Sequence, residues 1–463
     1  MNGLMIAGSK SGVGKTTVAM GLMAALSKKM TVQAYKVGPD YIDPAFHTYI
    51  TGRDCRNLDS YLLSNPMIHY LYRKNLKGAD IAIVEGVMGL FDGAEVGSDV
   101  GTSASIAKTL DLPVILVVDG SKVATSLAAT VKGFDLFDPD LRIDGVIINH
   151  VASPAHYDLL KRGIEFHTNV KPCGYLKKNS ALTLPERHLG LVPASEQLAL
   201  DEIFQQLGAA IEETVDIEAV LSLAQLRDRN GCESSYELEG PEIFNKLPVR
   251  IGIAKDKAFN FYYQDALDLL EEFGHVTWLP FSPLKDQALP EDLDGVYIGG
   301  GFPEVFAEEL ASNQEFMTSL RTKLEEGMPY LAECGGLMYL CQGLIDLEGK
   351  RSEMLGWLPG TTEMTQRLQR FGYAELALTG SCILGHQGKT IRIHEFHRSK
   401  ADIPMATIYD IRKKRKDEVI QKWSCGYLKG NGIAAYAHMH FGGNLSFAAS
   451  FVDSCLTYKK GLE

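Results

Sequence analysis

The fold of the first half of the chain is decided by Gly3 to Thr17, which reads GLMIAGSKSGVGKTT. Residues 3–7 have the continuous apolar pattern of a buried strand, glycines follow, and helical spacing of apolar residues begins at Val18. Glycines let backbone N–H groups turn toward a phosphate, and the start of a helix adds positive potential there. The stretch therefore predicts a nucleotide-binding P-loop between a strand and a helix. The alternative is a glycine-rich turn that binds nothing.

The side chains of this loop divide into phosphate contacts and metal contacts. Lys15 would reach the β- and γ-phosphates of ATP, and the Thr16 hydroxyl would bind Mg²⁺. Ser9 stands where the standard motif has glycine, so the loop is a variant. The predicted ATP-binding residues are Ser11, Gly12, Val13, Gly14, Lys15, Thr16 and Thr17.

Carboxylates follow the apolar run at residues 81–84, and a P-loop needs such groups for its metal ion. Glu85 ends this run, at the edge of a parallel sheet where ligands bind, and Asp92 follows among glycines. We expect Glu85 to bind the metal and Asp92 to belong to the site. A helix cap for Glu85 and an ordinary turn for Asp92 are the alternatives. Charge is also dense at residues 36–43 and 56–59, where turn chemistry is the alternative to contact with substrate or metal.

Short apolar runs alternate with helical stretches, which is typical of parallel α/β sheets. A polar break near residues 225–250, with Gly240-Pro241, indicates a linker. We therefore predict an α/β protein with two doubly wound domains: residues 1–226 as the P-loop domain that binds ATP and substrate, 227–247 as the linker, and 248–463 as the second domain. The predicted strands are residues 3–7, 32–37, 80–84, 114–119 and 145–149 in the first domain, and 249–254, 276–279, 295–298 and 328–332 in the second.

Residues 328–340 predict a strand, a sharp turn and a helix, with Cys334 on the turn. A cysteine at a helix N-terminus has a lowered pKa, and its thiolate is a competent nucleophile. The N–H of Gly335 would face an oxyanion, and Gly300-Gly301 at another strand end would supply a further donor. His438, near the C-terminus, is the candidate base. A buried structural cysteine is the alternative.

The composition restricts the class of protein. The 463 residues include 46 Lys and Arg against 58 Asp and Glu, a net charge of −12, which argues against nucleic-acid and anionic-membrane partners. No apolar run reaches 18 residues, no export signal precedes the first strand, and the eight cysteines lack CxxC spacing. These features predict a cytoplasmic protein with neither a membrane span nor a disulfide framework. The basic run at residues 412–416 is expected to be a solvated turn.

Several stretches in chain order carry a family resemblance. Through them nearly the whole chain resembles the cobyrinic acid a,c-diamide synthase family, whose close relatives include the Ni-sirohydrochlorin a,c-diamide synthases of coenzyme F430 assembly. The stretches are 36–43 (KVGPDYID), 44–47 (PAFH), 56–59 (RNLD), 85–93 (EGVMGLFDG), 185–190 (PERHLG), 258–263 (AFNFYY), 299–304 (GGGFPE), 333–336 (ECGG) and 394–397 (HEFH).

The resemblance implies an N-terminal domain like dethiobiotin synthetase and a C-terminal class I glutamine amidotransferase domain. Cys334 matches the glutaminase nucleophile and His438 the histidine that activates it. Ordinary class I glutaminases have Glu two residues after that histidine, whereas this chain has His440, so Glu395 and His397 are the alternative candidates for the third member of the triad. By similarity the metal residues are Thr16, Asp59 and Glu85, and the substrate side is lined by Lys36, Asp40, Tyr41, Asp43 and Asp92.

The resemblance also implies the reaction, which is the amidation of two acetate carboxylates (a and c) of cobyrinic acid in cobalamin biosynthesis. ATP would activate each carboxylate as an acyl phosphate, and glutamine would supply the ammonia. The tetrapyrrole substrate is a polyanion, so local cations must hold it. The candidate cations are Lys36, Arg53, Arg56, Arg187 and His188, each of which has surface charge as its alternative.

Other functions stay open at this point. The same amidation on Ni-sirohydrochlorin is the serious alternative, and cobyric acid synthase is less favoured because GPDYID and RNLD belong to the a,c-diamide group. A partitioning-type ATPase switch is a more distant alternative, supported only by Lys10. That residue resembles the extra lysine of deviant P-loop ATPases, some of which use it across a dimer. A homodimer is therefore an expectation, with an exposed loop lysine as the alternative.

Overall fold

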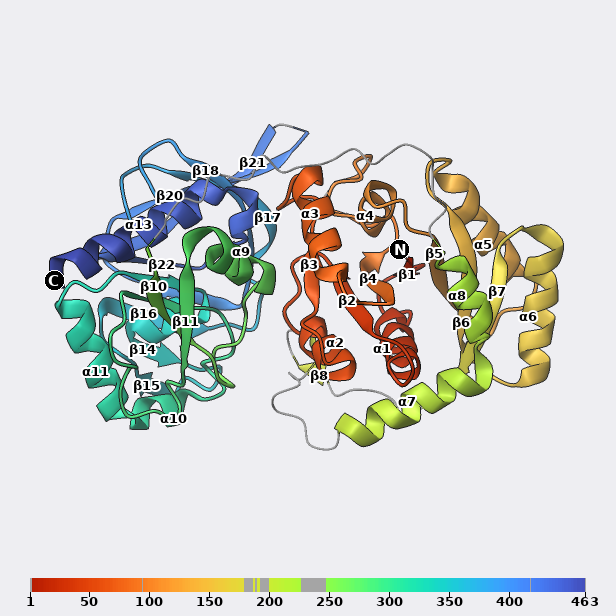
Figure 1. Ribbon diagram of the computed structural model, residues 1–463, viewed down its shortest axis with the longest axis horizontal. Helices are drawn as coiled ribbons and strands as arrows, with labels where there is room; N and C mark the ends of the chain where they lie inside the picture. Colours follow the sequence, from red (N-terminus) through yellow and green to blue (C-terminus); the bar gives the residue numbers. More distant parts are fainter. Residues whose placement is uncertain are drawn as a thin grey trace. The chain divides into compact units, whose positions relative to one another are not determined.

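The computed structural model describes residues 2–93, 95–178, 200–225, 247–416 and 418–462, and the backbone of the short strands β8 (Glu186–Arg187) and β9 (Gly190–Leu191). The chain divides into two units, Met1–Leu238 and Glu239–Glu463 (Figure 1). The predicted linker at 227–247 lies outside the described residues except for Leu247.

The first unit contains a seven-stranded sheet in the order β3-β2-β4-β1-β5-β6-β7, in which every pair of neighbours is parallel. This order, with helices between the strands, is the predicted doubly wound arrangement. The strands are β1 (Asn2–Gly8), β2 (Val32–Val37), β3 (Arg56–Leu58), β4 (Ile81–Gly89), β5 (Val114–Asp119), β6 (Ile143–Val151) and β7 (Lys171–Lys177). The helices are α1 (Lys15–Leu26), α2 (Asp43–Thr51), α3 (Asn65–Leu76), α4 (Ser103–Thr109), α5 (Ser126–Phe137), α6 (Pro154–His167), α7 (Leu200–Thr214) and α8 (Ile217–Leu223).

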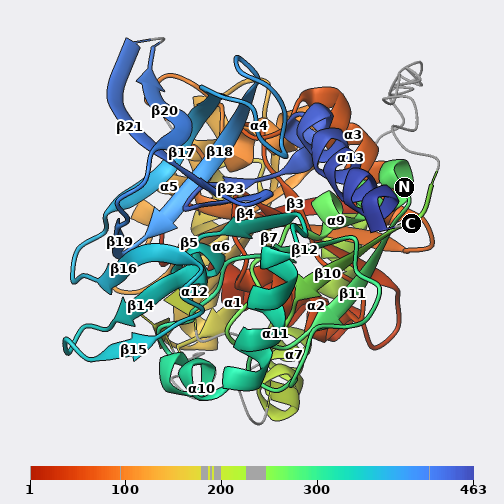
Figure 2. The same cartoon turned by 90° about the vertical axis from the view of Figure 1, so that its left-hand side faces the viewer.

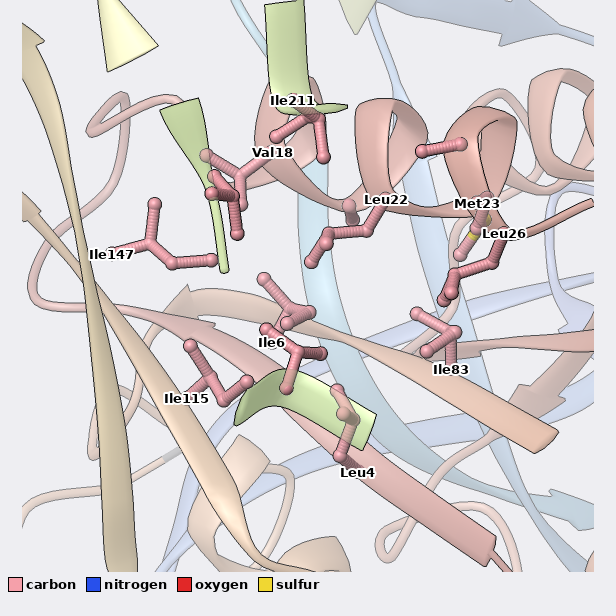
Figure 3. Packing of buried hydrophobic residues seen from close by; sticks show 14 of the residues in the cluster. Leu4, Ile6, Val18, Leu22, Met23, Leu26, Ile83, Ile115, Ile147 and Ile211 are labelled. Atoms are coloured by element: carbon pink, nitrogen blue, oxygen red, sulfur yellow. The ribbon is translucent and has the colours of Figure 1, made fainter. Parts of the chain in front are cut away.

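The core of this unit joins the central strands to α1 and α7. Apolar side chains of β1, β4, β5 and β6 meet those of α1, and Ile211 of α7 packs against the same cluster (Figure 3). The helices approach closely, since a Cβ on Gly21 of α1 would lie 2.6 Å from Cγ1 of Ile211. Burial on both faces of the sheet explains why these strands read as continuous apolar runs. The cluster includes Leu4, Ile6, Val18, Leu22, Met23, Leu26, Ile83, Ile115, Ile147 and Ile211.

The second unit contains a ten-stranded sheet in the order β11-β10-β12-β13-β22-β21-β20-β17-β18-β23. The first five strands are parallel; four of them, β10 to β13, are among the predicted strands, whereas β22 and the antiparallel extension formed by the remaining strands are not. The strands are β10 (Val249–Ala254), β11 (Val276–Phe281), β12 (Gly295–Ile298), β13 (Tyr330–Glu333), β17 (Arg370–Leu378), β18 (Thr390–His397), β20 (Thr407–Arg415), β21 (Glu418–Lys429), β22 (Gly432–Ala435) and β23 (His438–Met439).

A four-stranded sheet in the order β15-β14-β16-β19 accompanies this large sheet. Its strands are β14 (Cys341–Ile345), β15 (Arg351–Glu353), β16 (Leu358–Met364) and β19 (Ser399–Asp402). The helices of the unit are α9 (Gln264–Gly274), α10 (Ala307–Ser312), α11 (Gln314–Glu325), α12 (Gly335–Leu340) and α13 (Leu445–Leu462), with a 3₁₀ turn η3 at Phe441–Gly443. In the part of the chain that the structure describes, none of the helices has the length and apolar character needed to cross a membrane.

Two local predictions are wrong. The basic run at residues 412–416 is not a turn, because its first four residues belong to β20 and pair with β21 in a long hairpin (Figure 2). Arg412 pairs with Asp410 and Lys414 with Glu375, so carboxylates on the sheet compensate the charge. Glu85 does not end its strand, because β4 continues to Gly89.

Two candidate active sites

The phosphate loop connects β1 to α1, and its glycines adopt backbone conformations that other residues avoid. Gly12 and Gly14 have φ of 72° and 89°. A Cβ on Gly14 would lie 2.0 Å from Nδ2 of Asn149, and that amide donates to the carbonyl of Val13 at 2.9 Å. No side chain caps the start of α1. The loop thus presents a helix N-terminus whose positive potential is available to an anion.

Glu85 is the centre of a buried network in the first unit. Its Oε1 accepts from Nζ of Lys15 at 2.7 Å, from Oγ1 of Thr16 at 2.6 Å and from Nζ of Lys36 at 3.1 Å. Its Oε2 accepts from Nε2 of His47, on α2, at 2.6 Å. Burial raises the pKa of Glu85, but the charges of Lys15 and Lys36 outweigh it and hold the pKa well below the usual range. Glu85 is therefore an ionised carboxylate in contact with both P-loop side chains.

Lys36 links Glu85 to a second carboxylate. Its Nζ lies 2.6 Å from Oδ2 of Asp43 and 3.6 Å from Oδ2 of Asp40. Burial and the neighbouring Asp40 raise the pKa of Asp43 to about 6, against the opposing charge of Lys36. Burial lowers the pKa of Lys36, but the charges of Asp43 and Glu85 outweigh it and raise the pKa well above the usual value. Burial lowers the pKa of Lys15.

The donor set of this network fits a magnesium ion. Oxygen atoms of Thr16, Asp43 and Glu85 lie together, since the Thr16 hydroxyl also lies 3.5 Å from Oδ2 of Asp43. Among the described residues there is no group of three or more His, Cys, Asp or Glu arranged to hold a metal by themselves. Mg²⁺ in nucleotide sites binds through one or two protein ligands, with water and phosphate completing its shell, so an incomplete protein shell is what the chemistry requires.

The other predicted residues of this unit have turn or fold contacts. Asp59 is buried, and its Oδ1 accepts from the N–H groups of Tyr61 and Leu62. Asp92 accepts from the N–H of Gly89. Asp40, which precedes Tyr41, accepts from two N–H groups of its own turn, those of Ile42 and Asp43.

Of the predicted cations outside the network around Glu85, some make contacts that stabilise the fold and others lie on the surface. Arg53 donates to Gln33 and to the carbonyls of Asn75 and Lys77, so it holds the fold together. Lys10 is largely exposed, with Nζ 3.6 Å from Asp119. The side chains of Arg187 and His188 lie outside the described residues.

Cys334 occupies a sharp elbow between β13 and α12. Its φ of 50° and ψ of −101° are unusual for a residue with a side chain, and such strain is typical of functional turns. Its N–H donates to Ala435 of β22 at 2.7 Å, and its carbonyl accepts from Met338 at 3.1 Å. A Cβ on Gly336 would lie 2.2 Å from the carbonyl of Ile298, so only glycine fits there. Burial and the nearby Glu304 raise the pKa of the Cys334 thiol, which makes the expected lowering at the helix N-terminus wrong.

The glycines predicted for the oxyanion site gather beside this elbow. A Cβ on Gly335 would lie 3.1 Å from the backbone N of Gly301. A Cβ on Gly300 would lie 2.6 Å from Cε1 of His438 and 3.4 Å from its Nε2. The backbone N–H of Gly335 favours a lower pKa of the Cys334 thiol, but burial outweighs it. Sequence-distant residues of the predicted glutaminase site thus lie together.

The carboxylate beside His438 is Glu333, which the sequence analysis missed. Oε2 of Glu333 lies 3.7 Å from Nδ1 of His438 and accepts from the hydroxyl of Tyr297 at 2.8 Å. Burial raises the pKa of Glu333 to about 8, while burial and the neighbours His394 and His397 lower the pKa of His438 to about 3. A signal was present in the sequence, because Glu333 directly precedes Cys334 in the ECGG stretch.

The residues suggested for the third triad position have other partners. Nδ1 of His440 accepts from the N–H of Gly442 and so caps η3. Glu395 accepts from Nε1 of Trp423 and lies 3.6 Å from Nε2 of His397. His397 donates from Nδ1 to the carbonyl of Ser399 at 2.7 Å.

Comparison with known proteins matches both halves of the chain. Residues 4–192 match the CobQ/CobB/MinD/ParA nucleotide binding domain, and residues 250–445 match the CobB/CobQ-like glutamine amidotransferase domain. A cobyrinate a,c-diamide synthase of Listeria monocytogenes is 46% identical over 447 residues, which cover 96% of this chain and 97% of the relative. Proteins of the same name from Streptococcus sanguinis (45% identical, covering 98% of this chain and 99% of the relative) and Salmonella typhimurium (44% identical, covering 94% of each) are also similar over nearly their full length.

Proposed function

The chain belongs to the cobyrinate a,c-diamide synthase family, and from this premise we propose that it amidates the a and c acetate carboxylates of cobyrinic acid in cobalamin biosynthesis, using ATP and glutamine. The observation that carries the proposal is the near-full-length similarity to enzymes of this name. The geometry supports it, because one chain holds a phosphate loop with a buried carboxylate and a cysteine elbow with a histidine.

The first unit would activate the substrate. A carboxylate oxygen attacks the γ-phosphorus of ATP, the bond to the β-phosphate oxygen breaks, and ADP leaves, which yields an acyl phosphate. Lys15 and the N–H groups at the start of α1 would hold the phosphates. Thr16 and Glu85, with Asp59 by family similarity, would hold Mg²⁺, which neutralises charge on the phosphate oxygens when it is bound. Ammonia then attacks the acyl carbon and phosphate leaves, so that the amide is formed.

The second unit would supply the ammonia. His438 takes the proton of Cys334, the sulfur attacks the amide carbon of glutamine, and the N–H groups of Gly301 and Gly335 face the oxyanion. The intermediate collapses to a thioester as the proton passes to the leaving nitrogen and ammonia departs. Water then hydrolyses the thioester to glutamate and restores the thiol. Because burial keeps the Cys334 thiol protonated at rest, a base is required for the first step.

Binding of the tetrapyrrole is part of the proposal. Lys36, Asp40, Tyr41, Asp43 and Asp92 are proposed for the substrate side of the first site. Lys36 is the cation of this set, and it already compensates Asp43 and Glu85. A homodimer and a cytoplasmic location stay predictions from the sequence.

The test offers the full-length protein ATP, Mg²⁺ and amide-¹⁵N glutamine with cobyrinic acid, and in parallel with sirohydrochlorin and Ni-sirohydrochlorin. Mass spectrometry follows the label into the macrocycle. We expect two labelled amides on cobyrinic acid. Preference for Ni-sirohydrochlorin would replace the substrate and keep the chemistry, whereas ATP hydrolysis without label in any macrocycle would overturn the proposal.

A further inference from the structure

The carboxylate next to the nucleophile in sequence is also the one next to the base in space. We propose that Glu333 is the positioning residue of the glutaminase site: it holds His438 through Nδ1 and stabilises the imidazolium that forms when Cys334 loses its proton. This assignment rests on the proposed glutaminase function of the second unit. It places the third member of the triad before the nucleophile, whereas ordinary class I glutaminases carry it two residues after the histidine.

Backbone and side-chain donors fix the Glu333 carboxylate from two strands. The hydroxyl of Tyr297, on β12, donates to Oε2 at 2.8 Å, and the N–H of Met439, on β23, donates to Oε1 at 3.1 Å. Glu333 is 2% exposed. Each carboxylate oxygen keeps a further lone pair, and Nδ1 of His438 lies 3.7 Å from Oε2.

The orientation of the His438 ring matches this role. Its Cε1 and Nε2 edge faces Gly300, at the strand end that meets the Cys334 elbow, and its Nδ1 faces Glu333. To take a proton at Nε2, the neutral ring must carry its hydrogen on Nδ1, and this N–H needs an acceptor. Oε2 of Glu333, 3.7 Å from Nδ1, is the oxygen placed to accept this proton when the two groups move a few tenths of an ångström closer, and it would then select the tautomer with a free Nε2.

The ionisation states of Glu333 and His438 determine when the contact between them stabilises the site. Burial raises the pKa of Glu333 to about 8 and lowers the pKa of His438 to about 3, so two isolated charges are costly here. Transfer of the thiol proton to His438 would create a buried cation beside Glu333, and this cation would favour the ionised form of the Glu333 carboxyl over the protonated form. The other titratable groups that interact with this pair or with the thiol include Tyr262, Tyr297, Tyr409, Tyr436, His394, His397, Glu304 and Glu395.

The experiment compares Glu333→Gln with Glu395→Gln in the full-length protein. Both carboxylates are 2% exposed, but Glu395 contacts Trp423 and His397 rather than His438, so it is a matched control. We expect Glu333→Gln to lower glutamine-dependent kcat/KM by about 10²-fold while ammonia-dependent amidation continues. Tyr297→Phe, which keeps the carboxylate and removes one donor, should lower it by about tenfold. Glu395→Gln should have a much smaller effect.

A second readout separates positioning from loss of structure. The rate of Cys334 alkylation by iodoacetamide, followed by peptide mass spectrometry against pH, should show a more alkaline midpoint in Glu333→Gln, because the imidazolium that accompanies the thiolate is no longer stabilised. Glu333→Asp should restore part of the shift. An unchanged rate and midpoint in Glu333→Gln, or an alkaline shift in Glu395→Gln instead, would overturn the assignment.

Cys334→Ala separates this inference from the proposed function. If Cys334→Ala abolishes the use of glutamine and Glu333→Gln does not, the glutaminase function stands and the role of Glu333 is wrong. If Cys334→Ala still uses glutamine, the proposed function of the second unit fails, and the role of Glu333 fails with it.

Discussion

Nζ of Lys15, at the start of α1, lies 2.7 Å from Oε1 of Glu85 on β4. This contact joins the phosphate-loop lysine to a carboxylate 70 residues away in the sequence. The same oxygen accepts from Thr16, and the register of the sheet places Glu85 opposite Lys36 of β2. A triphosphate with Mg²⁺ would offer a phosphate oxygen to Lys15 and a metal ion to Glu85. Lys15 and Glu85, which pair with each other here, would therefore exchange this ion pair for contacts with the phosphate and with Mg²⁺.

Lys15→Ala should lower ATP-dependent amidation by about 10²–10³-fold, because it removes a fixed cation from the phosphate site. Glu85 would still have Lys36 and His47 as partners, so the variant should fold. The measurement is amide formation with ammonium as nitrogen donor, with glutamine hydrolysis by Cys334 as the control. Amidation at the normal rate would contradict the placement of ATP at this loop.

Gly300→Ala should lower glutamine hydrolysis by about tenfold or more, because the new Cβ would lie 2.6 Å from Cε1 of His438 and would displace the ring. Gly380→Ala is the control in the same unit, since a Cβ there meets only Cγ2 of Ile408, at 3.6 Å. Steady-state glutaminase assays of both variants test this. Equal activity of the two would show that His438 has room to move.

His440→Asn should flatten the pH dependence of stability. Burial lowers the pKa of His440 from 6.5 to about 3, so the unfolded chain binds a proton that the folded chain refuses. The stability that this residue contributes is present above pH 6.5 and is lost as the pH falls toward 3, by about 1 kcal/mol per pH unit. Asn keeps an oxygen for the N–H of Gly442 but does not titrate.

The neighbouring pair of Glu333 and His438 does not contribute the same dependence of the free energy of unfolding on pH. Between about pH 4.5 and 6.5 the unfolded chain carries a proton on His438, and the folded pair carries one on Glu333, whose pKa is raised to about 8. Free energies of unfolding of the wild type and of His440→Asn are measured in urea from pH 4 to 7, and the value for the wild type minus that for the variant should rise with pH up to about 6.5 and then level off. Parallel curves would be the contrary result.

Two glycine substitutions in helices should have opposite effects on stability. Gly133 lies in α5 with nothing within 4 Å of an added Cβ, so Gly133→Ala should stabilise the chain by about 0.5–1 kcal/mol. Gly21 lies in α1, where an added Cβ would be 2.6 Å from Ile211, so Gly21→Ala should destabilise it by about 1–3 kcal/mol. Thermal midpoints of both variants test this, and shifts of the same sign would contradict it.

Much of the fold could be predicted because the parallel strands are buried on both faces and read as apolar runs. β2, β5, β10 and β12 have the predicted bounds. The antiparallel strands β17, β20 and β21 could not be found in this way, because many of their residues are exposed or only partly buried and the apolar signal is diluted. The basic run in β20 is the clearest case, since pairing with β21 and with carboxylates across the sheet overrides its loop-like composition.

The site residues likewise divide into those that local sequence motifs reveal and those that only the three-dimensional structure reveals. Lys15, Thr16 and Cys334 lie in local motifs whose backbone requirement is visible in the sequence, and the structure places them accordingly. His47 lies beside Glu85 and Glu333 beside His438, and these neighbours come together only in three dimensions. Both lie in stretches that the sequence analysis singled out, but neither spacing nor composition indicates which neighbour each of them meets.

The nucleophile elbow is fastened to the sheet by backbone pairing, since Cys334 donates to Ala435 and β13 runs beside β22. Cys334 is thus held by the β13–β22 pairing, and His438, on β23, is held by pairing with β18 of the same sheet. We expect the amide protons of residues 330–334 to exchange with solvent only when this whole sheet opens, at the slowest rates in the unit. Catalytic alignment and global cooperativity would then be one property, so that a variant which loosens this sheet loses glutaminase activity together with its fold.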